Sequence, residues 1–350
     1  MFERTLVIAM TCAGAGSIAS ASQRAEVSEP ADAQWIDYAA RSGPGAGKRV
    51  VLLSGDDEYR SEEALPMLGE VLAVRHGFEC RVVFSVDPDT GEIDPEEKAN
   101  LPGLDALEHA DVLVLFTRFR RLSDADMALV VDYVESGRPV IAIRTATHAF
   151  AYEADSKSPY RHWSWDWKGP DHPDWLSGFG QHVLGTSWVD HHGKHGAQST
   201  RGVVAEGAGS NPILRGVRDV WGPTDVYAVR ALPLDARVLL EGAVLDGMSP
   251  DSPPVEGAQN APRMPLVWLR ERELPDAKRQ RVVCSTIGAA VDLRSEDLVR
   301  LLVNSVYWCA GLEAQIPERA EVAPLRPYEP TMFGFGAFRR GMHPSDFAAR

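Results

Sequence analysis

Val140-Ile-Ala-Ile143, followed at once by Arg144-Thr-Ala-Thr-His148, is the stretch that decides the fold. Its short apolar run predicts a strand that is buried on both faces, as in a parallel sheet. Similar apolar runs precede it at 50–53, 78–86 and 111–116. Helical spacing separates some of these runs, at 61–75 and at 123–136. The alternation predicts a mostly parallel sheet covered by helices on both faces.

The rest of the chain fits the same α/β class. Further strands are expected at 226–229, 238–240, 266–269 and 281–287, and a closing helix at 295–310. Since right-handed crossovers wind such sheets in both directions, we expect a flavodoxin-like, doubly wound, mostly parallel sheet. The runs at 238–240 and 266–269 predict an antiparallel extension of that sheet.

The first 22 residues resemble a secretory signal peptide. Arg4 gives a basic start, an apolar run follows, and Ala19-Ser20-Ala21 has the small-x-small pattern of a cleavage site. The apolar run is too short to span a bilayer. We therefore expect cleavage near Ala21 or Ser22, a periplasmic or secreted protein, and no membrane insertion after cleavage.

Three further segments follow the signal. Residues 23–48 are polar and predict a linker or N-terminal arm, 49–312 form the α/β domain, and 313–350 form a Pro-rich C-terminal tail. The tail contains an apolar, aperiodic stretch at 332–338, which we expect to pack on the domain or on a partner.

Charge and cysteine content exclude several classes of function. The net charge is −14, without a basic stripe, so nucleic acids and anionic membranes are poor partners. A small neutral or polar ligand suits the chain better. Beyond the signal, Cys80, Cys284 and Cys309 are too few and too far apart for a disulfide framework or a thiolate metal cluster. We expect them to be buried as small apolar residues.

The residues that follow each predicted strand are the first candidates for a site, because ligands of open parallel sheets bind beyond the carboxyl ends of the strands. Acids, arginines and a histidine converge there from four segments. They are Asp56, Asp57, Glu58 and Tyr59; Thr117, Arg118, Arg120 and Arg121; Arg144, Thr145, Thr147 and His148; and Thr286, Gly288 and Asp292.

The segment 151–200 holds six of the ten histidines and five of the nine tryptophans, with little regular patterning. Long loops of this kind more often bind ligands than merely connect elements. Trp163, Trp165 and Trp167 stand at alternate positions, and aromatic rings beside polar groups suit sugar recognition. The alternative is a lid that packs these tryptophans against the core.

Three histidines lie close together in Asp190-His-His-Gly-Lys-His195. Imidazoles bind zinc or iron, and they also transfer protons or bind substrates. A strand would not place His191 and His192 on one face, so a metal site would use one of them together with His195. His191 and His195 are the expected metal ligands, and a structural role stays open.

Several stretches together resemble the ThuA-like (trehalose utilisation-like) proteins of the class I glutamine amidotransferase-like superfamily. They are Gly55-Asp-Asp-Glu-Tyr59, Arg144-Thr-Ala-Thr-His-Ala-Phe150, Gly180-Gln-His-Val-Leu-Gly185, the histidine stretch 190–195, Thr286-Ile-Gly-Ala-Ala-Val-Asp292, Leu302-Val-Asn-Ser-Val-Tyr-Trp308 and Phe333-Gly-Phe-Gly336. The resemblance covers residues 49–312 and the last of these stretches. It implies the amidotransferase-like fold and a carbohydrate or keto-sugar ligand.

Two departures from the superfamily bear on chemistry. A glutaminase needs a nucleophilic Cys on the turn after the strand, but this chain has Arg144, where many ThuA-like proteins carry His. Ala289 stands where a second His would often follow the late strand. We therefore expect no glutaminase activity.

We predict that the protein binds or transforms a carbohydrate or keto-sugar derivative. His148 or His192 would transfer protons, and Arg144 and Arg118 would hold a carbonyl or oxyanion. The expected substrate-binding residues are Asp56, Asp57, Tyr59, Arg118, Thr145, Trp163, Trp165, Gln181 and Asp292.

Two alternatives stay open. A metal-dependent hydrolase would use His191, His195 and Asp190 around a divalent metal such as zinc. A non-catalytic sugar-binding or assembly module would use the same pocket without proton transfer. The substrate and the oligomeric state, including a homo-oligomer, are open as well.

Overall fold

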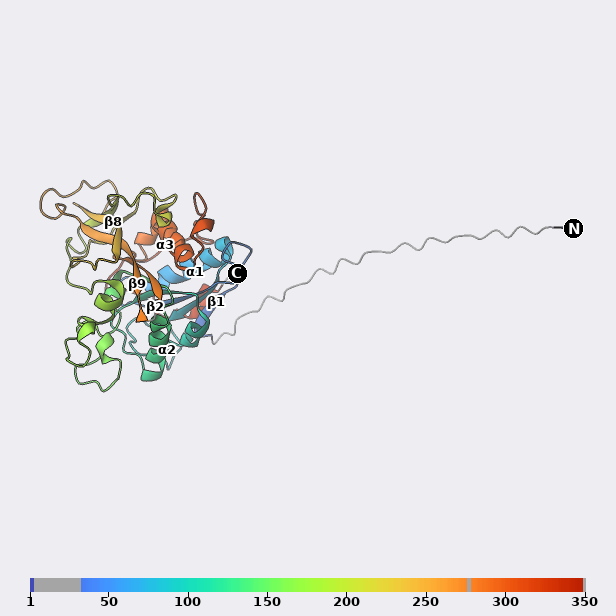
Figure 1. The fold of residues 1–350 in the computed structure, drawn as a ribbon, viewed down its shortest axis with the longest axis horizontal. Coiled ribbons are helices and arrows are strands. Elements are labelled where there is room, and N and C mark those ends of the chain that lie inside the picture. The colour runs from blue at the N-terminus through green and yellow to red at the C-terminus, as the bar shows by residue number, and fades with distance from the viewer. Residues whose placement is uncertain (3–32, 276–277, 349–350) are drawn as a thin grey trace.

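The computed structural model describes residues 1–2, 33–275 and 278–348. The described chain forms one ten-stranded sheet in the order β1-β3-β2-β4-β5-β10-β9-β8-β6-β7, flanked by helices (Figure 1). The α/β class predicted from the sequence is therefore confirmed. The predicted signal peptide, apart from its first two residues, lies outside the described part.

Five neighbouring strands run parallel and form the centre of the sheet. They are β3 (Glu79–Phe84), β2 (Arg49–Gly55), β4 (Val112–Thr117), β5 (Val140–Ile143) and β10 (Arg279–Ser285). Their carboxyl ends lie at one edge of the sheet, which we call the carboxyl edge. The residues nominated from the sequence follow these strand ends.

The sheet is extended at both sides by antiparallel strands. On the β10 side these are β9 (Met264–Glu273), β8 (Ala236–Leu245), β6 (Ser199–Val204) and β7 (Trp221–Gly222). On the other side β1 (Trp35–Tyr38) pairs with β3. The predicted antiparallel extension is confirmed for β8 and β9. β1 arises from the segment that was expected to be a linker or arm.

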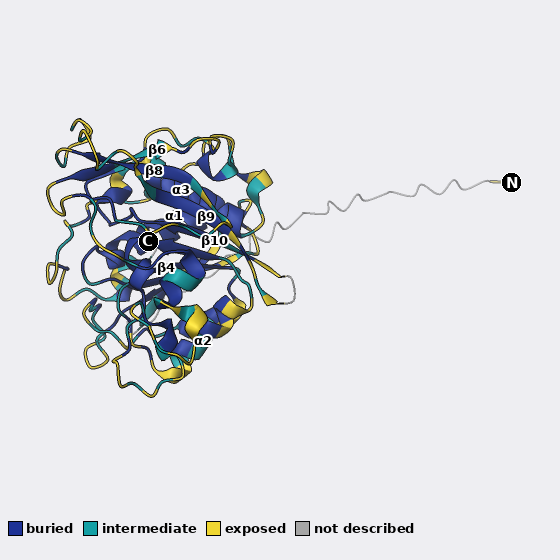
Figure 2. Ribbon diagram, turned by 60° about the vertical axis from the view of Figure 1, so that its left-hand side comes forward, coloured by how far each residue is buried: buried dark blue, intermediate teal, exposed yellow. Residues whose placement is uncertain are grey.

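Each face of the sheet has its own hydrophobic core, because successive side chains of a strand point to opposite faces. Val50 and Leu52 face α1 (Ser61–His76) and α3 (Glu296–Cys309), while Val51 and Leu53 face α2 (Asp124–Glu135). Figure 2 shows the buried strands between these layers. The finer expectation of a doubly wound, flavodoxin-like sheet stays a prediction.

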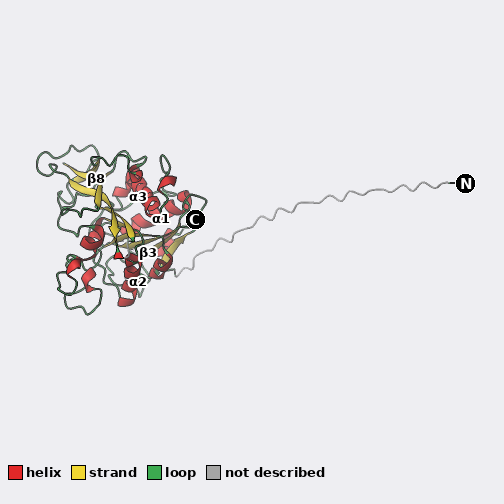
Figure 3. Cartoon of the chain, in the orientation of Figure 1, coloured by secondary structure: helices red, strands yellow, loops and turns green. Residues whose placement is uncertain are grey.

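The remaining helical elements are short turns. They are η1 (Leu104–His109), η2 (Arg144–His148), η3 (Arg161–Trp163), η4 (Pro173–Trp175), η5 (Gly180–Leu184), η6 (Pro212–Leu214), η8 (Asp292–Arg294), η9 (Glu313–Gln315) and η10 (Pro344–Phe347). The described segment between β5 and β6 contains no helices other than such short turns, and long loops join them (Figure 3). Among the described residues, we find no helix of the length and apolarity that a membrane span requires.

One predicted strand, 226–229, is wrong. Tyr227 makes a single bridge to His191, and the segment otherwise bonds to a loop. The amide of His192 donates to the carbonyl of Val226, and the amide of Ala228 donates to Asp190. The segment is apolar because it is buried, but its backbone hydrogen-bond partners lie in the loop 190–193 and not in a strand.

The C-terminal segment from 313 to 348 packs along α1 and β1. Arg326 donates two hydrogen bonds to Glu70 of α1, and the hydroxyl of Thr331 donates to Glu63. The hydroxyl of Tyr38 in β1 donates to the carbonyl of Phe347 at 2.7 Å. These contacts run back toward the carboxyl edge, where residues 333–335 lie over the start of α1.

Gly180 tests how tightly η5 is joined to the carboxyl edge. A Cβ at this position would overlap the carbonyl oxygen of Thr147 in η2. We expect Gly180→Ala to lower the free energy of unfolding by about 1–3 kcal/mol, measured by urea denaturation, because backbone must shift. Gly209→Ala is the control, since a Cβ there meets no described atom within 4 Å. Equal effects of the two variants would contradict this packing.

Candidate functional site

Arg144 occupies the turn after β5 and is completely buried. Its guanidinium lies between two tyrosine rings, 4.1 Å from the ring centre of Tyr59 and 4.2 Å from that of Tyr227. Nη2 is 3.0 Å from Oδ1 of Asp225, and Nη1 donates to the carbonyl of Thr286 at 2.8 Å. Burial alone would lower the pKa of Arg144, but the acidic groups around it raise that pKa well above its ordinary value. The side chain is a fixed positive charge.

The backbone of Arg144 has a φ of +44°, a left-handed conformation that is uncommon for residues other than glycine. It lets the chain turn sharply from β5 into η2. This strained turn is where the superfamily resemblance placed its catalytic position, and here it aims an arginine into the protein interior.

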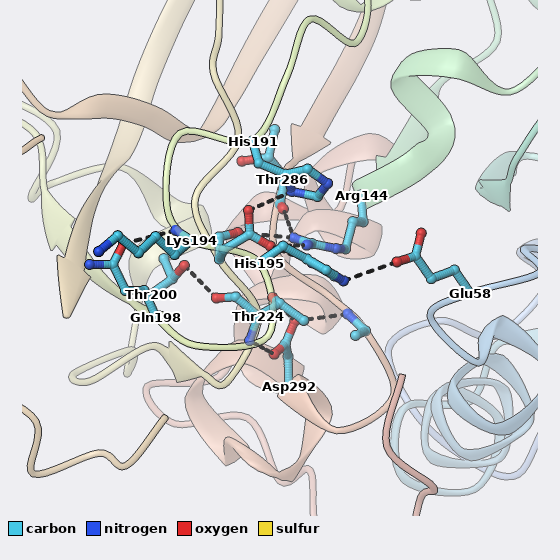
Figure 4. Close-up of polar contacts among 12 residues, drawn as sticks. Glu58, Arg144, His191, Lys194, His195, Gln198, Thr200, Thr224, Thr286 and Asp292 are labelled. Carbon is cyan, nitrogen blue, oxygen red and sulfur yellow. Dashed lines mark hydrogen bonds and ion pairs between the residues drawn. The ribbon is translucent and has the colours of Figure 1, made fainter. Parts of the chain in front are cut away.

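Asp225 is the centre of the site. It is completely buried, and both of its carboxylate oxygens accept hydrogen bonds from histidines. Nδ1 of His191 is 2.7 Å from Oδ2, and Nδ1 of His195 is 3.1 Å from Oδ1 (Figure 4). Burial raises the pKa of Asp225, but the hydrogen bond from His191 and the charge of Arg144 outweigh it and bring the pKa to about 2. The carboxylate is therefore ionised at neutral pH and orients both rings.

Glu58 links this centre to the end of β2. Its Oε1 lies 3.2 Å from Nε2 of His195, and its Oε2 lies 3.4 Å from Nη1 of Arg118. Burial raises the pKa of Glu58, although the charge of Arg118 opposes that shift. We call Arg144, Asp225, His191, His195 and Glu58 the acid–histidine network.

Asp57 and Lys98 extend the chain of charges outward. Asp57 lies 3.0 Å from Nη1 of Arg118 and pairs with Lys98 on its other oxygen. Burial raises the pKa of Asp57, but Lys98 and Arg118 outweigh it and lower that pKa below its ordinary value. Both carboxylate oxygens are thus engaged with cations, so Asp57 fixes Arg118 in place.

Two predicted substrate-binding acids hold loops together instead. Asp56 is completely buried and accepts hydrogen bonds from the amides of Glu58 and Tyr59 and from the hydroxyl of Thr145. Asp292, equally buried, accepts from Thr224 and from the amides of Gly288 and Ala289. Figure 4 shows Asp292 beneath the network, with Thr224 beside it. Both acids hold in place the loops that surround the network. Thr145 contributes through its hydrogen bond to Asp56.

An aromatic band borders the network. Trp165 lies 6.2 Å from Trp188, Trp188 lies 6.1 Å from His191, and His191 lies 4.6 Å from His195, between ring centres. Phe333 continues the band at 5.1 Å from His195 and 5.5 Å from Tyr59. Trp165 and Trp188 are half-buried, so parts of their rings remain accessible.

His148 lies behind the aromatic band, between Phe119 and Trp188, with ring-centre distances of 5.0 and 5.5 Å. Burial, followed by the charge of Arg118, lowers the pKa of His148 well below its ordinary value, so the imidazole is neutral. Its Nδ1 lies 3.1 Å from the hydroxyl of Thr147, and we find no hydrogen-bond partner for Nε2 among the described residues. The open nitrogen of this neutral imidazole can accept a hydrogen bond, although the lowered pKa makes the ring a weaker base than an ordinary histidine.

Three predicted site residues are not part of this arrangement. Trp163 is completely buried and stacks on Phe179 at 5.6 Å, so it packs the core of the loop region instead of meeting a ligand. Nε2 of His192 lies 2.8 Å from the carbonyl of Gln259, away from the network. The amide of Gln181 donates to the carbonyl of Gly185 and stabilises its own turn.

Asp225, Trp188 and Phe333 are site residues that the sequence does not predict. Asp225 precedes an apolar run with the pattern of a strand, whereas the rule for parallel sheets nominates residues that follow strands. Phe333 belongs to the tail and reaches the site only through the fold. Glu58 was nominated by its place after β2 but received no role.

His191, His195 and Asp225 also form a group that could hold a metal ion, with ligand atoms within 4.8 Å of one another. Two imidazoles and one carboxylate are a usual donor set for zinc. The nearby guanidinium of Arg144 and the existing Nδ1–Asp225 hydrogen bonds oppose a cation, because the ligand atoms already serve each other. The geometry thus permits a metal without favouring it.

Asp225→Asn tests the buried ion pair. Since the change leaves the charge of Arg144 buried and uncompensated, we expect the free energy of unfolding to fall by about 3–5 kcal/mol. A carboxylate whose pKa is lowered by folding stabilises the protein above its unfolded pKa of about 4. The difference between the two proteins should therefore be full above pH 4 and shrink as the pH falls toward 2.

Asp219→Asn is the matched control for that measurement. Asp219 pairs with Arg201 at 2.9 Å, but its side chain is 60% exposed. We expect a loss below about 1 kcal/mol. A comparable loss in both variants would show that burial of the Arg144–Asp225 pair carries no special weight.

No family model matches the sequence, and the search of curated proteins found no match either. Among solved structures, the chain is similar to two proteins provisionally named ThuA-like. The one from Bacteroides uniformis has 13% identity and a TM-score of 0.47, over 78% of this chain and 95% of the other. The one from Parabacteroides merdae has the same identity and TM-score, over 87% and 99%. The sequence motifs resemble the family whose name these two structures carry.

Proposed function

We propose that this chain is an exported ThuA-like protein that binds and transforms a carbohydrate or keto-sugar derivative, without glutaminase activity. One observation carries the proposal: His191, oriented by the buried carboxylate of Asp225, lies directly beside the half-buried ring of Trp188. A proton-transfer group and an aromatic surface are thus adjacent. The family assignment is supported by the sequence motifs, and the export by the N-terminal pattern.

The strand order supports the finer fold assignment within this proposal. The parallel strands occur in the order β3-β2-β4-β5-β10. The chain adds strands on one side of β2 first and then on the other, so the strand order reverses between β2 and β4. This is the flavodoxin-like order, whose ligands bind where the strand order reverses. Asp57, Glu58 and Arg118 follow β2 and β4, at the place that this rule nominates.

Aromatic rings favour a sugar as the ligand. The apolar C–H face of a sugar ring can pack on an aromatic ring, while the hydroxyl groups need polar partners. Trp165 and Trp188 are accessible on one side of the site, and Glu58, His191 and His195 supply donors and acceptors on the other. The site therefore offers both kinds of contact within a short span.

Proton transfer would be shared between a base and an acid. Asp225 holds Nδ1 of His191, which leaves its Nε2 without a partner among the described residues and able to accept a proton. Glu58, whose pKa is raised by burial, could donate one when it is protonated. Removal of a proton beside the carbonyl of a keto-sugar requires such a base together with a donor at the developing oxyanion. His148 is a second base at the other side of Trp188.

Replacement of the two adjacent histidines separates this mechanism from the one expected from sequence. We expect His191→Asn to lower kcat on a keto-sugar by at least about 10²-fold, because the oriented base is lost. His192→Asn should leave kcat within about twofold, since the His192 ring bonds to Gln259 outside the network. Turnover of a panel of sugars and keto-sugars, followed by mass spectrometry, identifies the substrate first.

The opposite result, with loss in His192→Asn alone, would overturn the role of His191. Binding without turnover of any panel member, seen as a raised melting temperature, would instead support a non-catalytic sugar-binding module.

The metal-dependent hydrolase is the second candidate, because the close grouping of His191, His195 and Asp225 permits a metal ion. A metal there would activate water for attack on a substrate bond. This alternative predicts about one zinc, iron or manganese per chain in untagged protein, measured by inductively coupled plasma mass spectrometry. The metal should be lost when His191 and His195 are both replaced by Ala, and retained in His192→Asn. Metal-free wild-type protein would eliminate it.

A further inference from the structure

The guanidinium of Arg118 lies over two aromatic rings at the carboxyl edge. Its central carbon lies 4.9 Å from the ring centre of Phe119 and 4.7 Å from that of Phe335. Nη1 faces the carboxylates of Asp57 and Glu58, at 3.0 and 3.4 Å. The group is therefore contacted by two rings and by two carboxylates.

The opposite edge of the same guanidinium, Nε with Nη2, has no hydrogen-bond partner among the described residues. Nε is fully enclosed, and the neighbouring hydroxyl of Thr117 is enclosed and without a partner as well. Buried polar groups in folded proteins are almost always hydrogen-bonded. The unpartnered Nε at the end of β4 therefore indicates that something other than the described protein atoms bonds there.

We propose that this edge of Arg118 binds the carboxylate of an acidic sugar, such as a uronate or aldonate, and that Phe335 of the C-terminal loop covers the bound group. The inference rests on the proposed function and names its substrate class. The Nε–Nη2 edge of an arginine presents two parallel N–H donors, which match the two oxygens of a carboxylate. A single hydroxyl would use one of them.

The charges around Arg118 suit an anionic group. Burial, followed by the charges of Arg118 and Arg144, lowers the pKa of His148 well below its ordinary value. On the other side Glu58 has a raised pKa and can take up a proton. Protonated Glu58 would no longer compete with the ligand for Arg118. A carboxylate at the unpartnered edge of Arg118 would meet this cation directly, although the whole chain has a net charge of −14.

Phe335 is placed by the backbone around it, and its ring is 62% exposed. The amide of Gly334 donates to the carbonyl of Glu58 at 2.8 Å, and the buried Arg60 donates to the carbonyl of Gly334. Gly334 and Gly336 have φ values of +146° and +65°, which bend the loop on either side of the ring. The loop is thus fastened at its centre, with an exposed aromatic ring over the guanidinium.

Isothermal titration calorimetry on the full-length mature protein tests the inference with D-glucuronate and D-gluconate against D-glucose. We expect the wild-type protein to bind at least one of the acids at least about tenfold more tightly than D-glucose, as a charge-assisted bidentate contact predicts. Arg118→Lys keeps the charge but loses the planar edge, so its affinity for the acids alone should fall at least about tenfold. Phe335→Ala should lower the affinity for the acids severalfold.

Matched controls keep these outcomes specific. Arg49→Lys alters an exposed arginine at the amino end of β2, paired with Glu79, and Met332→Ala alters a side chain of the same loop with 53% exposure. Both should bind the acids as the wild-type protein does. Thermal melting of each variant shows whether it is folded, and the exposed position of Phe335 makes that variant a safe second test.

The possible failures are distinguishable. Binding of neutral sugars or keto-sugars as tight as that of the acids, unchanged in Arg118→Lys, overturns the acidic-sugar inference and leaves the proposed function standing. Absence of millimolar binding by the wild-type protein for every sugar, acidic or neutral, overturns both. Acid binding that survives Arg118→Lys but not Arg49→Lys overturns the assignment of Arg118.

Discussion

The ion pair between Arg144 and Asp225 is the constraint on which the rest of the site depends. An arginine placed in a protein interior loses its hydration, and the loss is offset only if a carboxylate and further acceptors surround it. Here Asp225 supplies the charge, Thr286 supplies a carbonyl, and Tyr59 and Tyr227 supply ring faces. These partners come from β2, β10 and the loop after β7, so one buried cation joins the separate segments of the carboxyl edge.

Basic and acidic side chains alternate outward from that pair. From Arg144 the order is Asp225, His195, Glu58, Arg118, Asp57 and Lys98, with each neighbour in contact. In an environment of low polarity, a proton gained or lost at one member changes the energy of all of them. The pKa of Asp225 is lowered to about 2, whereas burial raises the pKa of Glu58 above its ordinary value. The chain of charges is therefore rigid in geometry but adjustable in protonation.

Much of the fold could be predicted because its signals are local. Continuous apolar runs located β2, β4 and β5, and the turn at Arg144 was recognised from its position after β5. The rule that ligands bind beyond the carboxyl ends of parallel strands also predicted the correct edge of the sheet for Glu58 and Arg118. Trp163 and Trp165 show the limit of this reasoning: they alternate in sequence, but packing against Phe179 buries the first and leaves the second half-accessible. The roles of Asp225 and Phe333 could not be predicted in this way, because they depend only on contacts with residues far away in the sequence.

The docking of residues 333–335 on Glu58 and Arg60 has a consequence for the order in which the molecule is made. A ribosome, or an export channel, releases the chain from its N-terminal end, so the strands of the central sheet emerge long before the segment that completes the site. A partly emerged chain holds Glu58 and Arg118 without their aromatic cover. Completion of the site is therefore tied to arrival of residues 333–335, and a chain that is terminated before them lacks this part of the site.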